Sequence, residues 1–234
     1  MNLLAIDTAA SILSVAVLNS VEIFSAETEA VTKHSELVME LIDSLIKKAN
    51  ILPKDLNGIL CMGGPGSFTG LRIGYSIAKG LALSLSVPFA PVPTLECIAH
   101  SEKFAQGLTL AVIEARKNAS FYAFFKDGKR LTEDKDSNFS QIANEIELYK
   151  NEYKQITLTG PGSKLLYESL NENTKNDLSL VFEKDGYAKE LIAIAKSKNL
   201  FNNDCTAYLY SGPEYIRKTD AEIALAEKWL VVSG

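Results

Sequence analysis

The loop GGPGSFTG at residues 63–70 holds the residue types that most readily form a ligand site in this chain. It joins an apolar segment to an amphipathic one, so its backbone N–H groups would lie at a helix start, where the helix dipole attracts anions. It lacks the Lys-Ser/Thr pair of a Walker loop, and Thr69 stands where a dinucleotide-binding loop has its third glycine. A tight turn in which Ser67 or Thr69 caps the helix explains the same residues. Both interpretations stay open on spacing alone.

The histidines and cysteines form no catalytic or metal-binding pattern. His34 and His100 are the only two histidines, and we assign neither a role. Cys61, Cys97 and Cys205 include no CxxC pair, so their spacing indicates neither a zinc site nor a disulfide framework. Cys97 is interpreted as a small core side chain, since no histidine-based activation is apparent around it. We expect a protein of the reducing cytoplasm.

Composition and charge exclude several classes of protein. The 234 residues are 47% hydrophobic and 23% charged, which suffices for one large domain or two lobes with a substantial core. The net charge of -5 provides no overall positive field, so we expect any RNA to be held by a partner. The apolar N-terminus has no basic segment and is interrupted by Asp7, and no apolar run reaches about 18 residues. Neither a signal peptide nor membrane contact is therefore expected.

The same order of secondary structure elements is predicted twice along the chain. Hydrophobic periodicity and turn residues predict, in the first half, strands at 3–7, 12–18 and 21–27, a helix at 34–49, a strand at 58–62, a helix at 70–86, a short strand to Pro91 and a helix at 94–105. They predict, in the second half, strands at 108–114 and 120–125, a short GKRL strand, a helix at 139–150, a strand at 155–160, a helix at 163–170, a strand at 178–182 and a helix at 187–199. We find no residue-level identity between the halves.

This order predicts the fold class. A three-stranded meander continued by βαβα crossovers forms a mixed sheet with helices against it, and two such lobes face each other across a cleft. We therefore predict a two-lobed α/β protein with the duplicated order βββαβαβα of the actin-like ATPase (ASKHA, ribonuclease H-like) fold. The predicted boundaries are a first lobe at 1–105, a second lobe at 106–212, and a tail with a C-terminal helix at 213–234.

The helix predicted at 70–86 has one face with almost no side chains. Glycine or alanine recurs there every four residues, so another element can approach closely. That element is either the sheet of the same lobe or a helix of another subunit. We expect the second, with a partner interface formed by Gly70, Arg72, Gly74, Ala78 and Ala82 and by Leu37 and Leu41 of the helix at 34–49.

Three motifs resemble the bacterial TsaB (YeaZ) family: LAIDTA at 4–9, GPGSFTGLRIG at 64–74 and PEYIR at 213–217. The resemblance spans essentially the whole chain and is closest in the first half. It implies an actin-like, non-catalytic subunit for making threonylcarbamoyladenosine next to the anticodon of tRNA. The implied partners are a homologous catalytic subunit, TsaD, and an ATPase, TsaE. The chain alone is expected to form a homodimer, and to meet tRNA only through the complex.

The resemblance also implies that this chain has neither catalytic residues nor a metal site. The catalytic relative carries a metal-binding stretch, N-H-L-E-G-H, after the strand that follows its counterpart of the helix predicted here at 70–86. The corresponding stretch here is PTLECI at 93–98, so Thr94 and Ile98 replace both histidines. Neither side chain supplies the imidazole that iron or zinc would bind.

Nucleotide binding is implied more weakly. Actin-like folds bring the turn after the first strand of each lobe close to phosphates, which indicates Asp7, Thr8 and Glu114, with Gly160 and Gly162 near the base. Glu114 departs from the usual aspartate, and a carboxylate that caps a turn is an equal alternative. We expect no cofactor, or at most weak binding of ATP or ADP.

Two enzymatic functions compete with the subunit interpretation. They are a metallopeptidase-like activity and an actin-like kinase activity, both using the cleft between the lobes. The replacement of both imidazoles by Thr94 and Ile98 argues against the first, and tight binding or hydrolysis of ATP would favour the second. Direct tRNA binding is disfavoured by the acidic charge balance.

Overall fold

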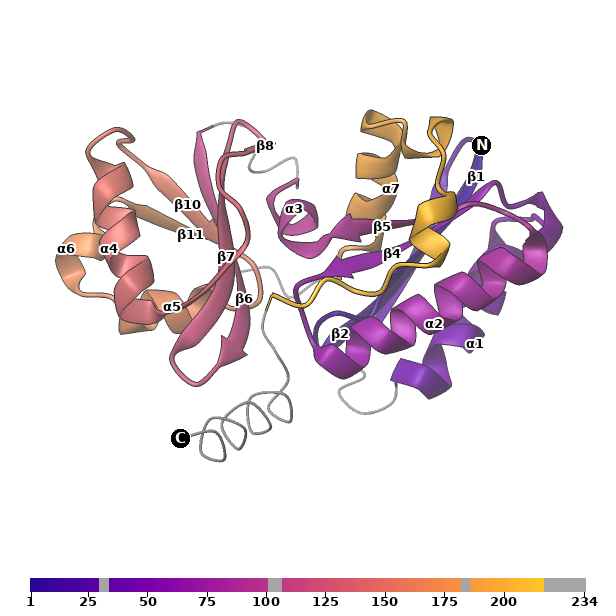
Figure 1. The fold of residues 1–234 in the computed structure, drawn as a ribbon, viewed down its shortest axis with the longest axis horizontal. Helices are drawn as coiled ribbons and strands as arrows, with labels where there is room; N and C mark the ends of the chain where they lie inside the picture. Colours follow the sequence, from indigo (N-terminus) through magenta and orange to yellow (C-terminus); the bar gives the residue numbers. More distant parts are fainter. Residues whose placement is uncertain (30–33, 101–106, 182–185, 217–234) are drawn as a thin grey trace, which may run out of the picture.

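The computed structural model describes residues 1–29, 34–100, 107–181 and 186–216. These residues form two β-sheets with helices on both sides of each (Figure 1). No helix within these ranges is long and apolar enough to cross a membrane.

The first sheet has the strand order β3-β2-β1-β4-β5. Its strands are β1 (Asn2–Asp7), β2 (Ile12–Asn19), β3 (Ile23–Glu29), β4 (Gly58–Gly64) and β5 (Phe89–Pro93). The first three strands form an antiparallel meander, and β4 and β5 continue the sheet in parallel with β1. Two helices, α1 (His34–Lys48) and α2 (Phe68–Leu85), cover one face, and a 3-10 turn at Pro53–Asp55 precedes β4.

The second sheet repeats this arrangement with the order β11-β10-β6-β7-β8. Its strands are β6 (Leu108–Arg116), β7 (Ala119–Lys126), β8 (Lys129–Arg130), β10 (Ile156–Thr159) and β11 (Leu178–Val181). The short strand β9 (Lys135–Asn138) also pairs with β7. Reversed, this order matches the first sheet strand for strand, so the predicted duplicated two-lobed α/β fold is confirmed. Neither β9 nor the short helix α6 was predicted.

Two helices, α4 (Phe139–Lys150) and α5 (Ser163–Ser169), cover the outer face of the second sheet, and the short helix α6 (Glu172–Lys175) packs against α4. A capping box begins α4, because Asn138 Oδ1 accepts a bond from the Gln141 N–H and Gln141 Oε1 accepts one from the Asn138 N–H.

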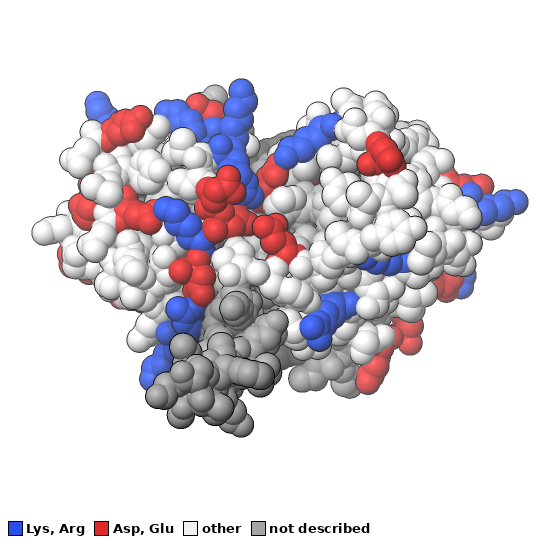
Figure 2. All heavy atoms as spheres, in the orientation of Figure 1, with Lys and Arg blue, Asp and Glu red and all other residues white. Residues whose placement is uncertain are grey.

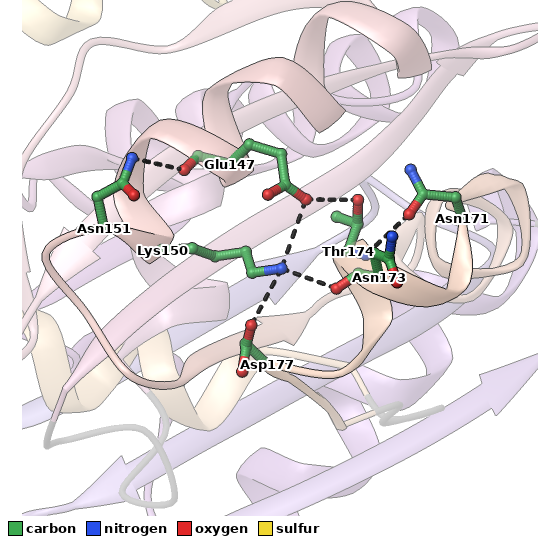
Figure 3. A network of polar contacts seen from close by, with 7 residues as sticks. All are labelled: Glu147, Lys150, Asn151, Asn171, Asn173, Thr174 and Asp177. Carbon is green, nitrogen blue, oxygen red and sulfur yellow. Dashed lines mark hydrogen bonds and ion pairs between the residues drawn. The ribbon is translucent and has the colours of Figure 1, made fainter.

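A polar network fixes the other end of α4 to α6 and to the start of β11 (Figure 3). Lys150 Nζ donates to the carbonyl oxygen of Asn173 at 2.8 Å and lies 3.0 Å from Asp177 Oδ2. The buried Thr174 hydroxyl donates to Glu147 Oε1 at 2.6 Å. Every charged group drawn there has a partner, so we interpret this cluster as structural.

Two helices lie between the sheets, α3 (Thr94–Ala99) and α7 (Ala188–Ser197) (Figure 1). They share one core with the inner faces of both sheets, which includes Leu60 of β4 and Ala111 of β6. The molecule therefore has five layers, with three helical layers around two sheets.

The predicted lobe boundary at residue 212 is wrong. Although α7 follows the second sheet in sequence, it packs against β1, β2 and β4 of the first sheet. Two 3-10 turns, Leu200–Asn202 and Thr206–Leu209, and the segment to Ile216 also lie against the first lobe. The first lobe thus consists of residues 1–100 and 186–216, and the second of residues 107–181. The predicted tail helix, AEIALAEKWLVV at 221–232, lies outside the described ranges.

Candidate docking surface and interlobe cleft

The loop at 63–70 forms the start of α2. Ser67 is the N-cap, and its Oγ accepts a bond from the Gly70 N–H at 3.2 Å. The Ser67 N–H in turn donates to the carbonyl oxygen of Ala9 at 2.9 Å, which holds the loop against the turn after β1. The helix-cap interpretation of this loop is therefore confirmed.

The small-residue face of α2 packs on its own lobe, so the prediction that another subunit's helix contacts this stripe is wrong. Gly70, Gly74, Ala78 and Ala82 are all buried. A Cβ atom on Gly70 would lie 1.9 Å from the Thr8 carbonyl oxygen, and one on Gly74 would lie 2.6 Å from Thr8 Oγ1. Thr8 Oγ1 also donates to the Gly70 carbonyl oxygen at 2.6 Å. The glycines are needed because the turn after β1 crosses directly beneath the helix.

The opposite face of α2 and the adjacent part of α1 leave an exposed groove, which we call the α1–α2 groove. It is lined by Ser35, Met39, Phe68, Thr69, Arg72, Ile73, Ser76 and Ile77. Met39 is 46% exposed and Phe68 is 36% exposed, so the groove presents apolar side chains to solvent. Of the predicted interface residues only Arg72 lines this groove, since Leu37 and Leu41 are half-buried against the core beneath α1.

The C-terminal segment 209–216 runs beside α2 and is fixed to it by two cations. Lys79 Nζ donates to the carbonyl oxygens of Leu209, at 2.9 Å, and of Ser211. Arg72 Nε donates to Tyr215 Oη at 3.1 Å. The Glu214 N–H donates to the Gly63 carbonyl oxygen at 2.8 Å. Glu214 and Tyr215 of the PEYIR motif thus support the start of α2, a role that the sequence alone did not indicate.

The cleft between the lobes has a volume of about 470 Å³. The first lobe contributes the turn after β1 and the start of α2, and the second contributes Ile113, Glu114, Ala115 and Pro161. Among the described residues that line it there is no lysine or arginine. Glu114 provides the one charged group among these described lining residues, and its carboxylate has the same sign as a nucleotide phosphate.

The predicted nucleotide residues are only partly brought together. Glu114 reaches the cleft and the Gly160–Gly162 turn borders it through Pro161, whereas Asp7 and Thr8 are buried. Asp7 accepts bonds from the N–H groups of Ala9 and Tyr187, both at 3.0 Å. Burial raises the pKa of Asp7 to about 6 in spite of these two bonds, which act to lower it. Asp7 therefore caps its turn and contacts the start of α7.

The two walls of the cleft contain the same tetrapeptide, Gly-Pro-Gly-Ser, at 64–67 and at 160–163. Each follows the parallel strand beside the first strand of its lobe, and its first glycine has a positive φ, 112° at Gly64 and 101° at Gly160. A Cβ on Gly66 would lie 3.0 Å from the Ala9 carbonyl oxygen, and one on Gly162 would lie 2.7 Å from the Glu114 nitrogen. The prediction of no residue-level identity between the halves is wrong, and direct comparison of the halves would have found this repeat.

Thr94 and Ile98 make structural contacts to these two turns. Thr94 Oγ1 accepts a bond from the Gly64 N–H at 3.2 Å. Ile98 is buried, and its Cγ2 would lie 3.0 Å from a Cβ on Gly160. No group of three or more His, Cys, Asp or Glu side chains within the described ranges could hold a metal ion.

His100 and the three cysteines do not line the cleft. His100 is half-buried at the end of α3, and His34 is the first residue of α1. Cys61, Cys97 and Cys205 are buried, and burial raises the pKa of the Cys97 thiol well above its ordinary value. This disfavours the thiolate, as expected for a core side chain.

These features define a class: a two-lobed, actin-like α/β protein with an exposed apolar groove on its first lobe and a cleft whose described lining residues include no lysine or arginine. A family model described as TsaD, tRNA N6-adenosine threonylcarbamoyltransferase, matches residues 25–225. The tRNA threonylcarbamoyladenosine biosynthesis protein TsaB of Bacillus subtilis is 28% identical over 235 residues, with 98% of each chain covered. The TsaB protein of Escherichia coli is 34% identical over 128 residues, which cover 54% of this chain and 55% of the relative.

A solved structure of a Pseudomonas aeruginosa protein, described as similar to peptidase YeaZ, superposes with a TM-score of 0.76 at 20% identity. The superposition covers 92% of this chain and 99% of that one, and so supports the fold. The chain belongs to the family that the matching model describes, as one of its TsaB (YeaZ) members.

Proposed function

We propose that this chain is a non-catalytic subunit required for making threonylcarbamoyladenosine in tRNA. The observation that carries the proposal is the similarity, over 98% of both chains, to a protein named for that biosynthesis. The match to a family model named for the transferase itself supports a catalytic partner that is a homologue of this chain.

In this proposal the α1–α2 groove docks the catalytic homologue, TsaD, and the ATPase TsaE joins the pair. The exposed side chains of Met39 and Phe68 lie together with Ile73 and Ile77 in one groove, and a groove lined by apolar side chains suits contact with an apolar surface of another protein. When the partner is absent, a second copy of this chain pairs through the same face to give a homodimer.

The cleft takes no part in the chemistry of this chain in our proposal. A phosphoryl-transfer site stabilises phosphate charge with lysine, arginine or a metal ion. The described cleft wall instead offers the Glu114 carboxylate and small side chains, which favours weak or no binding of ATP and ADP. These observations favour neither a kinase nor a metallopeptidase.

Contact with tRNA is assigned to the complex. Acidic and basic side chains lie side by side over the second lobe (Figure 2), and several form ion pairs, including Arg116 with Asp136, Arg130 with Asp134 and Lys135 with Glu145. A cation that already has a carboxylate partner contributes little to the counterion release that drives nucleic acid binding.

Depletion of the chain in cells tests the proposal. We expect threonylcarbamoyladenosine to fall in tRNAs that read codons beginning with A, because an active site that is competent only in the docked state loses activity with the undocked fraction. Mass spectrometry of digested tRNA provides the measurement. Normal modification after full depletion would overturn the assignment.

Complementation of the depleted strain separates docking from folding. Met39→Asp introduces a charge into the α1–α2 groove and should fail to restore modification. Leu83→Asp is the matched control, because Leu83 is 64% exposed on α2 and lies outside the groove. Glu114→Ala should restore modification fully, and a severe defect from it would indicate a working site in the cleft.

A further inference from the structure

At the end of the α1–α2 groove the side chains of Phe68 and Tyr215 hold the Arg72 guanidinium group in a fixed position, and we call these three residues the Arg72 clamp. The guanidinium carbon of Arg72 lies 3.8 Å from the ring centre of Phe68 and 5.9 Å from that of Tyr215. The two ring centres are 4.9 Å apart, and Arg72 Nε donates to Tyr215 Oη at 3.1 Å. Stacking on aromatic rings and one hydrogen bond therefore orient the guanidinium group before any partner binds.

The clamp uses only part of the hydrogen-bonding capacity of Arg72. Its contacts within the described ranges are the two rings and the Tyr215 hydroxyl, and no carboxylate there forms an ion pair with it. The Nη donors, which suit the two oxygens of a carboxylate, make no hydrogen bond to described residues. Lys79, the other cation on this side of α2, differs because backbone carbonyl oxygens already satisfy it.

The position of the clamp makes the unused Nη donors of Arg72 important for binding. Arg72 and Phe68 both line the α1–α2 groove, so a chain that covers Met39 and Ile73 also removes water from the guanidinium group. Burial of a cation without a partner is strongly unfavourable, whereas a carboxylate placed beside it restores its hydrogen bonds and neutralises its charge.

We propose that the Arg72 clamp recognises an aspartate or glutamate side chain of the catalytic homologue that covers the α1–α2 groove. The inference rests on the proposed function and adds to it the chemistry of the contact. The partner surface is apolar, with a carboxylate at the end that meets the start of α2. Burial of apolar side chains supplies the contact area. The carboxylate determines how the partner is aligned along the groove, and it excludes proteins that have no carboxylate at this point.

Binding of full-length variants to the purified catalytic homologue tests this by calorimetry at several salt concentrations. Arg72→Met keeps an apolar stem and removes the charge, and we expect it to weaken binding at least about thirtyfold. Tyr215→Phe keeps the ring and removes the acceptor for Nε–H, so a loss of about two- to tenfold is expected. Lys164→Met removes an exposed cation from α5 of the second lobe and should bind as the wild type does.

The salt dependence of the affinity shows whether Arg72 forms an ion pair with the partner or only supports the shape of the groove. Wild-type affinity should fall as salt rises, and Arg72→Met should show a smaller slope, because screening acts on the ion pair and little on apolar contacts. Circular dichroism should show all variants to be folded, since Arg72 and Tyr215 are exposed.

The outcomes separate the two proposals. If the wild type binds and Arg72→Met binds within about twofold with the same salt slope, the clamp has no part in recognition. The clamp inference is equally overturned if Arg72→Met weakens only self-association, since its cation would then pair with a second copy. If the wild-type chain itself does not bind the homologue, the docking proposal fails, and the clamp inference fails with it.

Discussion

Asp7 connects the beginning of the chain to its last described helix. Its carboxylate accepts one N–H bond from Ala9, in the turn after β1, and one from Tyr187, at the start of α7. No cationic side chain is among the causes that shift its pKa, so burial dominates. The two hydrogen bonds fix the position of the Asp7 carboxylate between the turn after β1 and the start of α7. They offset only part of the free-energy cost of burying its charge.

This residue predicts a pH dependence of stability. The folded pKa of about 6 exceeds the ordinary value of 3.8, so between these pH values the folded chain binds more protons than the unfolded chain. The contribution of Asp7 to the free energy of unfolding therefore falls as pH rises through this window, by about 2 kcal/mol from pH 4 to pH 7.

Urea unfolding of the wild type and of Asp7→Asn at several pH values provides the measurement. Subtracting the two curves removes the titration of all other groups. From pH 4 to pH 7 we expect the free energy of unfolding of the wild type to fall by about 2 kcal/mol relative to that of Asp7→Asn. If the two plots of this free energy against pH are parallel, the pKa of Asp7 is not raised.

At the scale of the element, two glycines of α2, Gly70 and Gly80, differ in the space around them. A Cβ on Gly70 would overlap the Thr8 carbonyl oxygen, whereas Gly80 has no atom within 4 Å of the equivalent position. We predict that Gly70→Ala destabilises the chain by about 3 kcal/mol or more through overpacking against backbone. Gly80→Ala should instead stabilise it by up to about 1 kcal/mol, since alanine favours the helix.

Chemical denaturation of both variants measures these effects with the same substitution in the same helix. A stable Gly70→Ala variant would show that α2 can move away from the turn after β1. The small-residue face would then be open to a partner, as the sequence had suggested.

The sequence predicts elements well where local chemistry defines them. The helix at 139–150 has the predicted bounds because Asn138 and Gln141 form a capping box at its start. The contacts of an element depend on chain segments that the local pattern does not contain. The glycine and alanine spacing of α2 predicts a close approach, but the approaching group is the main chain of Thr8, 62 residues earlier.

The same reason explains the error over α7. An amphipathic pattern at 187–199 predicts a helix that covers a sheet, but the pattern is equally compatible with either of the two sheets. Tyr187 reaches Asp7 across 180 residues of sequence, and such pairing becomes visible only in three dimensions. The groove side chains Met39 and Phe68 were missed because exposed apolar residues have the same sequence signature as core residues.

At the scale of the whole molecule, the two lobes share one core. Residues of α3 and α7 contact the inner faces of both sheets, so neither sheet is fully covered without the central helices. Such an arrangement favours cooperative unfolding of both lobes together.

We predict that Leu191→Ala, at a fully buried position in α7, lowers protection against hydrogen exchange in β6 as well as in β1. The free energy of the opening that exposes the amides should fall by about 2–5 kcal/mol in both sheets, as for a large-to-small substitution in a core. The reciprocal variant Ile146→Ala, on the outer side of the second sheet, should raise exchange in β1. Exchange that rises in only one lobe would show that the lobes unfold independently.

The return of α7 to the first sheet also determines when that lobe is completed during synthesis. The ribosome makes β1 first and α7 about 180 residues later, since Asp7 and Tyr187 are separated by 180 positions. At about 5–20 residues per second, the nascent chain waits roughly 10–35 s before α7 emerges. During that interval one face of the first sheet, including Ala5 and Leu60, lacks its covering helix. A chain released before residue 186 therefore exposes an apolar sheet face of the kind that chaperones and proteases recognise.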